Sequence, residues 1–172
     1  MVSTSTGLSD PAAVVATVVD PEMPMLTLAD LGVVRRVETE GDAVTVTITP
    51  TYSGCPALDE MRADLRAALT AAGYRRVEVR TVFSPAWSTD WITEDGRRKL
   101  AEAGVAPPGR APQRVGAGPI PLTLGAPTAA GVRCPRCGTP GTEELSRFGP
   151  TACTELRRCP ACREPFEHMK EI

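Results

Sequence analysis

Aromatic side chains and histidine are the residue types that this chain of 172 residues has least of. Phe, Trp and Tyr make up 4% of the chain and His168 is its single histidine, whereas hydrophobic residues together make up 42%. A core built from this composition must consist mainly of Val, Leu and Ala. Because the histidine stands in the C-terminal tail, where we expect it to be solvated, a Cys–His hydrolase is disfavoured.

Catalytic signatures and a surplus of charge are also missing. The chain contains no nucleotide-binding motif, no pair of catalytic carboxylates in a recognisable frame and no Ser/His/Asp set. We therefore do not expect an enzyme in its own right. The formal net charge of −2 gives no general attraction to nucleic acid or to an anionic membrane.

Long apolar runs are absent as well. The longest, AAVVATVV, is too short to span a bilayer, and the N-terminal MVSTSTGLSD lacks the basic and apolar regions of a secretory signal. We therefore expect a cytoplasmic protein with no membrane association. In a reducing compartment, paired Cys-x-x-Cys motifs are expected to bind metal rather than to form disulfides.

Hydrophobic periodicity predicts helices and strands in the order α-β-β-α-β-α, followed by a cysteine-rich module. The predicted elements cover residues 11–19, 33–38, 43–49, 55–73, 75–83 and 93–104. Asp10 and Thr93 are the expected N-caps of the first and last helices, and a polar link at 39–42 joins the first two strands as a hairpin. This order predicts an α+β fold with a small sheet that has helices on one face.

Composition divides the chain into three parts. Residues 10–103 form the α+β domain. Residues 104–132, of which twelve are Gly or Pro, form a linker or strap, and its run GPIPLTLG is a candidate edge strand. Residues 133–172 hold five of the six cysteines and form the second folded module.

Four of these cysteines form two Cys-x-x-Cys pairs separated by 21 residues: Cys134, Cys137, Cys159 and Cys162. Two such pairs, brought together by a hairpin, predict tetrahedral coordination of Zn²⁺, as in a zinc ribbon. Gly138 directly follows the first pair, where a left-handed backbone is often needed.

The role of this metal remains open between two readings. Four thiolates also suit the iron of a rubredoxin-like electron carrier. Structural zinc is favoured, because a segment of about 40 residues with so few large apolar side chains cannot build a core by itself.

The module has seven basic and six acidic side chains, so a Zn²⁺ ion with four thiolates brings its charge to about −1. This sign disfavours nucleic acid and favours protein docking.

The other two cysteines, Cys55 and Cys153, need separate explanations. Cys153 lies six residues before Cys159, about 20 Å away along a strand, and so cannot bind the same metal. It is either a passive small side chain or an exposed thiol of a second, transient site. Cys55 precedes Pro56 at the expected N-cap or first position of the long helix, where the helix dipole lowers a thiol pKa. It is therefore either a nucleophile or metal ligand, or a buried cysteine in a tight turn.

Two further pairs of residues allow a functional and a structural interpretation. Asp20 and Glu22 in DPEMP could help to bind a metal ion, although capping and turning the chain is favoured. Trp87 and Trp91 in SPAWSTDW either cover one end of the aromatic-poor core or form a docking surface for a partner.

Two groups of motifs resemble known families. DPEMPMLTLADLGVV with TPTYSGCPALDEM is similar to the small domain of iron–sulfur assembly factors such as SufT. SPAWSTDWITEDGRRKLAEAGVAPP with FGPTACTELRRCPACREPF resembles the PaaD (PaaJ) family of accessory proteins in phenylacetate degradation. The resemblance extends over nearly the whole chain from Asp10. The family's domain cysteine matches Cys55 and its TAC cysteine matches Cys153, whereas Glu171 stands where the family tail often has a cysteine.

The resemblance implies an accessory protein of the multicomponent oxygenase that epoxidises phenylacetyl-CoA. Its expected partners are the reductase or oxygenase components, and its expected cargo is an iron–sulfur or di-iron centre. Cys55, with Cys153 from the ribbon tip or from a second copy of the chain, would then hold iron or a cluster transiently. A non-catalytic structural subunit and a stand-alone redox ribbon are the alternatives, and a homodimer is left open.

Overall fold

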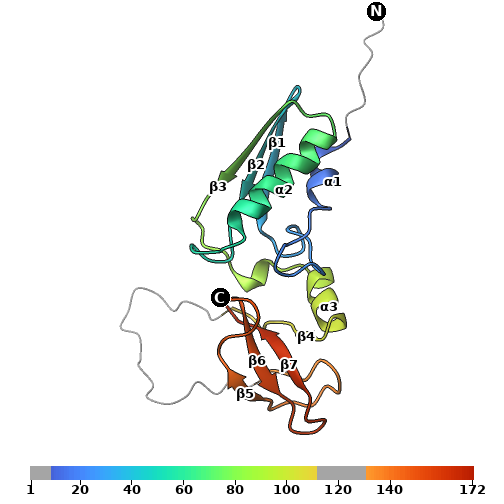
Figure 1. Cartoon of the computed structure of the whole chain (residues 1–172), viewed down its shortest axis with the longest axis vertical. Helices are drawn as coiled ribbons and strands as arrows, with labels where there is room; N and C mark the ends of the chain where they lie inside the picture. Colours follow the sequence, from blue (N-terminus) through green and yellow to red (C-terminus); the bar gives the residue numbers. More distant parts are fainter. Residues whose placement is uncertain (1–8, 112–130) are drawn as a thin grey trace, which may run out of the picture. The chain divides into compact units, whose positions relative to one another are not determined.

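The computed structural model describes residues 9–111 and 131–172. The chain divides into two compact units, Met1–Lys99 and Leu100–Ile172 (Figure 1). Most of the predicted linker, including its candidate edge strand GPIPLTLG, lies outside the described residues.

The first unit is an α+β domain, as predicted. Its elements are α1 (Pro11–Val15), β1 (Val34–Glu40), β2 (Ala43–Ile48), α2 (Leu58–Ala71), β3 (Arg76–Thr81) and the 3-10 turn η1 (Thr89–Trp91). The helix α3 (Glu94–Glu102) follows. The caps expected for the first and last helices are present, because Asp10 accepts a hydrogen bond from the Ala12 amide and Thr93 accepts one from Gly96.

The sheet of this unit has β2 at its centre, antiparallel to β1 and parallel to β3. The helix α2 connects the two parallel strands and lies across one face of the sheet (Figure 1). The alternating valines and isoleucine of β2 are buried, and the polar threonines between them face the other side. Met61, Leu65 and Leu69 form the buried face of α2. Each such side chain contributes about 1.5–3 kcal/mol when it leaves water.

The second unit is a small four-stranded sheet. It contains β4 (Val105–Ala106), β5 (Glu143–Ser146), β6 (Thr154–Arg158) and β7 (Pro165–Met169), in the order β4-β7-β6-β5. The hairpin of β5 and β6 confirms the expected ribbon. However, β4 lies inside the predicted linker, where it pairs in parallel with β7. The first residues of the predicted linker thus contribute a short strand to this sheet.

The C-terminal segment is a strand rather than a solvated tail. His168 on β7 is only 1% exposed, and its Nδ1 lies 2.9 Å from Oε1 of Glu155 on the neighbouring strand. The expectation that His168 is solvated was wrong, because β7 pairs along its whole length with β6 and places the ring beside a carboxylate.

The core of the second unit is small and contains metal-ligating residue types. Ala106, Cys134, Cys159 and Phe166 form one buried cluster. Arg157 is also buried, and it donates hydrogen bonds to the hydroxyl and the carbonyl oxygen of Thr142. So few apolar side chains supply little hydrophobic stabilisation, which agrees with a fold that depends on a metal ion.

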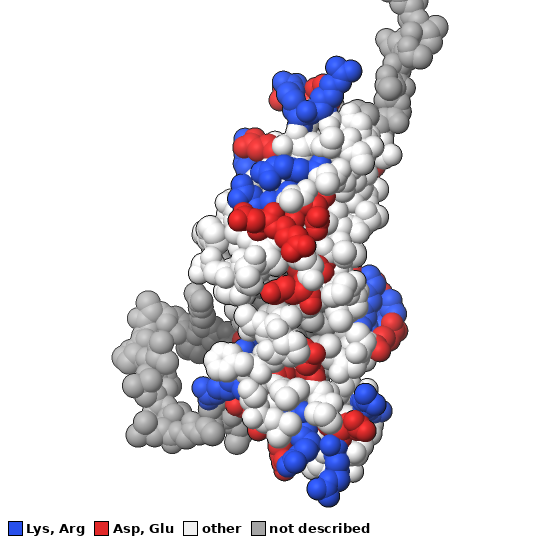
Figure 2. All heavy atoms as spheres, viewed as in Figure 1, with Lys and Arg blue, Asp and Glu red and all other residues white. Residues whose placement is uncertain are grey.

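On the described residues that Figure 2 shows, basic and acidic side chains lie in groups next to one another. In the part of the chain that the structure describes, no helix has both the length and the hydropathy needed to cross a bilayer.

Candidate metal centre

The two Cys-x-x-Cys motifs fold into the same backbone turn. In the first, the Cys134 amide donates to the carbonyl of Thr139 (3.0 Å) and the Gly138 amide donates to the carbonyl of Cys134 (2.9 Å). In the second, the Cys159 amide donates to Glu164 (3.1 Å) and Arg163 donates to Cys159 (3.0 Å). Each turn therefore fixes two thiols on one side of the chain.

A left-handed residue follows the second cysteine of each turn. Gly138 has φ = 73°, which confirms the conformation expected from the sequence. Arg163 has φ = 62° and is the only residue other than glycine with a positive φ among residues 9–111 and 131–172. This conformation costs a side chain about 1–2 kcal/mol, so the turn must be stabilised by the contacts that it makes possible.

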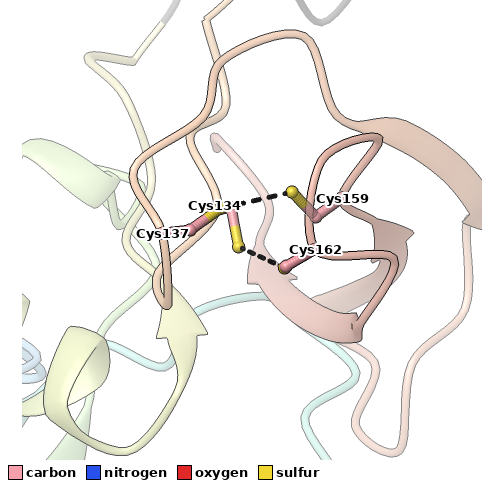
Figure 3. Close-up of side chains that lie close together, drawn as sticks. All are labelled: Cys134, Cys137, Cys159 and Cys162. Carbon is pink, nitrogen blue, oxygen red and sulfur yellow. Dashed lines mark hydrogen bonds between the residues drawn. The ribbon is translucent and has the colours of Figure 1, made fainter.

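The four thiols converge on one point. Their sulfur atoms all lie within 4.8 Å of one another. Sγ of Cys134 is 3.7 Å from that of Cys162, and Sγ of Cys137 is 3.5 Å from that of Cys159 (Figure 3). Zn–S bonds of about 2.3 Å in a tetrahedron place sulfur atoms about 3.8 Å apart. The donor set and its spacing therefore fit a tetrahedral divalent metal.

The thiols differ strongly in acidity. Sγ of Cys137 lies 3.3 Å from the Thr139 hydroxyl, and hydrogen bonds with this residue, together with one between Cys137 and Cys159, lower the pKa of Cys137 to about 6. A backbone hydrogen bond from Glu164 lowers the pKa of Cys162, but desolvation and the three neighbouring thiols outweigh it and raise that pKa to about 12. One thiolate forms readily and the last does not, because the negative charges repel one another. A cation is needed to hold all four as thiolates.

Cys153 lies at the opposite end of β6 from the metal-binding turns. It directly precedes the strand, whereas Cys159 directly follows it, as the spacing predicts. The thiol is 7% exposed, and its Sγ is 3.2 Å from the Thr151 hydroxyl. The exposed thiol considered for a transient site is therefore not found, and the structure agrees with a small buried side chain.

Cys55 lies in a turn that precedes α2. The helix begins at Leu58 with Ala57 as its N-cap, and the Leu58 amide donates to the Cys55 carbonyl (3.3 Å). The placement of Cys55 at the N-cap or first helical position was thus wrong. The helix dipole falls off within a turn, so it gives no strong reason for an activated thiol here. Cys55 is half-buried, so its side chain is partly accessible to solvent.

Two family models match the chain. One, described as the PaaD zinc beta ribbon domain, matches residues 121–170, and the other, described as an iron-sulfur cluster assembly protein, matches residues 12–80. A relative from Escherichia coli (strain K12), named as one subunit of a "Putative 1,2-phenylacetyl-CoA epoxidase", is 43% identical over 160 residues. These residues are 93% of this chain and 90% of the relative. The chain belongs to the PaaD family.

Other similarities cover about half of the chain. The "Fe-S protein maturation auxiliary factor" of Porphyromonas gingivalis (strain ATCC BAA-308 / W83) is 36% identical over 49% of this chain and 81% of its own length. A crystal structure of a domain of unknown function from Bacillus anthracis aligns at 26% identity with a TM-score of 0.49, covering 52% of this chain and 87% of that one. The family resemblance inferred from the motifs is confirmed by the E. coli relative and the two family models.

Asp20 caps a turn in the first unit. Its Oδ1 accepts hydrogen bonds from the amides of Glu22 (2.9 Å) and Met23 (2.8 Å), and the carboxylate is buried. Burial raises the pKa of Asp20, although the two amide hydrogen bonds oppose this effect. The pKa of Glu22 is raised by partial burial and by the charge of Asp20. These hydrogen bonds agree with the interpretation that DPEMP caps and turns the chain.

The two tryptophans of the chain pack against residues 31–35. Trp87 is buried and its indole N–H donates to the carbonyl of Leu31 (2.9 Å). The guanidinium carbon of Arg35 lies 3.5 Å from the ring centroid of Trp91, and a side chain at Gly32 would collide with Trp91. Docking through Trp87 is therefore excluded in this conformation, whereas Trp91 is half-buried under Arg35.

Sequence reasoning missed Thr139 and Arg163 at the metal centre. Both could have been found by aligning CPRCGT with CPACRE, because the two segments repeat the same pattern and form the same turn. It also missed the buried pair of Glu155 and His168, whose members lie on different strands and share no local signal.

Proposed function

We propose that this protein is an accessory factor of a phenylacetyl-CoA epoxidase. The factor assembles, delivers or repairs an iron–sulfur or di-iron centre of that enzyme. The match of residues 12–80 to an iron-sulfur cluster assembly model and the relative named as an epoxidase subunit support this proposal together. The observation that carries it is the separation of the thiols into two kinds. Four form one tight cluster in the second unit, whereas Cys55 of the first unit belongs to no such cluster among residues 9–111 and 131–172.

We assign structural zinc to the cluster of Cys134, Cys137, Cys159 and Cys162. A metal ion that replaces a missing core must stay bound, and four thiolates in a closed tetrahedron leave no position for a substrate. The metal would stabilise the sheet that carries β5, β6 and β7, and it would have no part in cargo transfer.

The cargo-binding role falls to Cys55. A site that releases its cargo benefits from incomplete protein ligation, since a client can then supply the remaining ligands. Cys55 would lose its proton to solvent and bind iron as a thiolate. Because Cys153 is buried, it is a poor second ligand, and we expect the client or a second copy of the chain to complete the coordination.

Anaerobic reconstitution with iron and sulfide tests this assignment. Wild type, Cys55→Ala and the matched variant Cys153→Ala are loaded, and iron, sulfide and zinc are counted per chain. Transfer to the cluster-free reductase component and to the metal-free oxygenase component is then measured. We expect Cys55→Ala to lose iron uptake and transfer while keeping its zinc, and Cys153→Ala to behave as wild type. Undiminished transfer by Cys55→Ala would remove Cys55 from the function.

The second candidate function is a non-catalytic structural subunit of the epoxidase. The name of the E. coli relative, a subunit, favours it. The two functions differ in stoichiometry. A structural subunit co-purifies with the oxygenase in equal amounts and is needed throughout turnover, whereas an assembly factor rescues a cluster-deficient component when added in substoichiometric amounts.

A further inference from the structure

The second unit has a small core, yet one of its aromatic side chains is exposed to solvent. Of its two phenylalanines, Phe166 is 5% exposed and Phe148, in the connection between β5 and β6, is 79% exposed. Burial of such a ring contributes about 1.5–3 kcal/mol, and aromatic side chains dominate interface energetics. A unit with so few apolar side chains gains nothing for its own stability from a ring in water.

The backbone that presents Phe148 is held by its own hydrogen bonds. Oγ of Ser146 accepts from the Phe148 amide (3.1 Å) and donates to the Phe148 carbonyl (3.0 Å). The Gly149 amide donates to the carbonyl of Thr154 (3.0 Å), and any side chain at Gly149 would collide with that threonine. The ring therefore projects from a built turn, and little ordering entropy would be lost when it binds.

Hydrogen bonds of partly buried side chains also hold this turn. The Thr151 hydroxyl contacts the hydroxyl of Thr154 and the thiol of Cys153, both at 3.2 Å. Lys170 follows β7 and donates from its Nζ to the carbonyl of Ala152 (2.9 Å). Cys153 is thus a buried member of this hydrogen-bonded group.

The surroundings of the ring are cationic. Nζ of Lys170 lies 5.4 Å from the centroid of the Phe148 ring, and Arg147 precedes it in the chain. Residues 145–152 contain no carboxylate, and the ion pair between Arg147 and Glu144 (3.4 Å) is exposed and therefore weak. Leu145 adds an exposed apolar side chain. We call Leu145, Arg147, Phe148 and Lys170 the Phe148 tip.

We propose that the Phe148 tip is a docking surface for a partner protein that offers an apolar pocket bordered by carboxylates. The ring would fill the pocket, and Arg147 and Lys170 would face its acidic border. A lipid surface is disfavoured, because the metal-loaded module carries about −1 charge and a single ring gives marginal membrane affinity. Identification of this partner as a component of the epoxidase rests on the function proposed above.

Binding of the full-length, zinc-loaded chain to each purified epoxidase component tests the inference. Phe148→Ala should weaken binding to one component by about 10-fold or more, as expected for a central aromatic anchor. Lys170→Glu and Arg147→Glu should weaken binding and reduce its dependence on salt. Phe83→Ala is the matched control, because Phe83 is also an exposed phenylalanine (54%) but lies in the other unit. Zinc content and thermal unfolding of every variant are compared with those of wild type.

If the chain binds a component and Phe148→Ala binds equally well, the docking surface is wrong and the proposed function stands. If no component binds, crosslinking in cells tests the tip. A photoreactive phenylalanine analogue is placed at position 148, and one at position 83 serves as the control. A mapped crosslink to an acid-bordered apolar pocket of another protein, weakened by Lys170→Glu, would support the tip and overturn the proposed partner. No crosslink specific to position 148, or Phe148-dependent binding to phosphatidylcholine–phosphatidylserine vesicles, would overturn the tip.

Discussion

Gly138 and Arg163 occupy equivalent positions in the two metal-binding turns and share a left-handed backbone, with φ angles of 73° and 62°. Only glycine adopts this conformation without a steric penalty. The two halves of the metal centre thus have the same geometry, but the second half contains a strained residue that the first avoids.

Arg163→Gly should therefore stabilise the metal centre, and Gly138→Ala should destabilise it. We expect a gain of about 0.5–1 kcal/mol for the first change and a loss of about 1–2 kcal/mol for the second, because the penalty of the left-handed backbone is removed or added. Zinc release to a chromophoric chelator during denaturant titration measures both. Arg163→Ala is the control, since it removes the side chain but keeps the strain. A gain equal to that of Arg163→Gly would show that the guanidinium, not the backbone, is responsible.

Removal of the metal should unfold the second unit and spare the first. The core of the second unit is too small to persist once the four thiols repel one another, whereas the first unit has its own buried face on α2. Both tryptophans, Trp87 and Trp91, lie in the first unit, so tryptophan fluorescence reports on that unit alone.

We therefore expect a strong chelator to abolish the dispersed amide resonances of residues 131–172 without changing tryptophan fluorescence. Cys137→Ser should have the same effect as the chelator, and Cys153→Ser should keep one zinc per chain. Iron in place of zinc, with a reducible absorption spectrum, would instead favour the redox ribbon. Loss of tryptophan signal on chelation would contradict the independence of the first unit.

Local features were predicted well from the sequence because their signals lie within a few residues. Asp10 and Thr93 cap their helices as expected, and Gly138 has the expected left-handed backbone. The start of α2 was predicted at residue 55, but the helix begins at Leu58. Pro56 is typical of the first helical position, but one further turn separates Cys55 from the helix.

Features that depend on distant partners could not be predicted. The burial of Trp87 requires the carbonyl of Leu31, and the burial of His168 requires Glu155 from another strand. Nothing near either residue in the sequence indicates these partners. The four thiols of the metal centre were found because their spacing is itself a signal, whereas Cys55 and Cys153 are single residues whose exposure only the fold determines.

Glu155 should be one of the most important side chains for stability in the second unit. Its Oε1 lies 2.5 Å from a guanidinium nitrogen of Arg157, which is 3% exposed, and 2.9 Å from Nδ1 of His168. Glu155→Ala leaves a buried cation without its partner, and we expect it to lower the free energy of unfolding by about 3–5 kcal/mol. Glu143→Ala is the control. It breaks the exposed ion pair with Arg158 (2.7 Å) and should cost less than about 1 kcal/mol. Equal effects in denaturant titrations would contradict the importance of burial.

Asp20 allows stability and function to be separated in the first unit. Burial raises the pKa of Asp20 in the folded state above its ordinary value of 3.8. The unfolded chain therefore loses this proton first, so the contribution of Asp20 is fully present below pH 3.8 and is lost as pH rises through the folded pKa. Above the folded pKa the buried carboxylate carries its charge at a cost in stability. Asp20→Asn removes that charge and can still accept the hydrogen bonds from the amides of Glu22 and Met23.

We expect Asp20→Asn to be more stable than wild type at pH 7, with a gain that shrinks as pH falls toward 3.8, as measured by tryptophan fluorescence in denaturant. Asp20→Ala should be less stable at every pH, because two buried amides lose their acceptor. If the carboxylate only caps the turn, Asp20→Asn will keep full iron uptake in the reconstitution assay. If instead iron uptake falls while stability rises, the charge of Asp20 takes part in binding iron. A functional residue that lowers the stability of its own fold is a known trade-off.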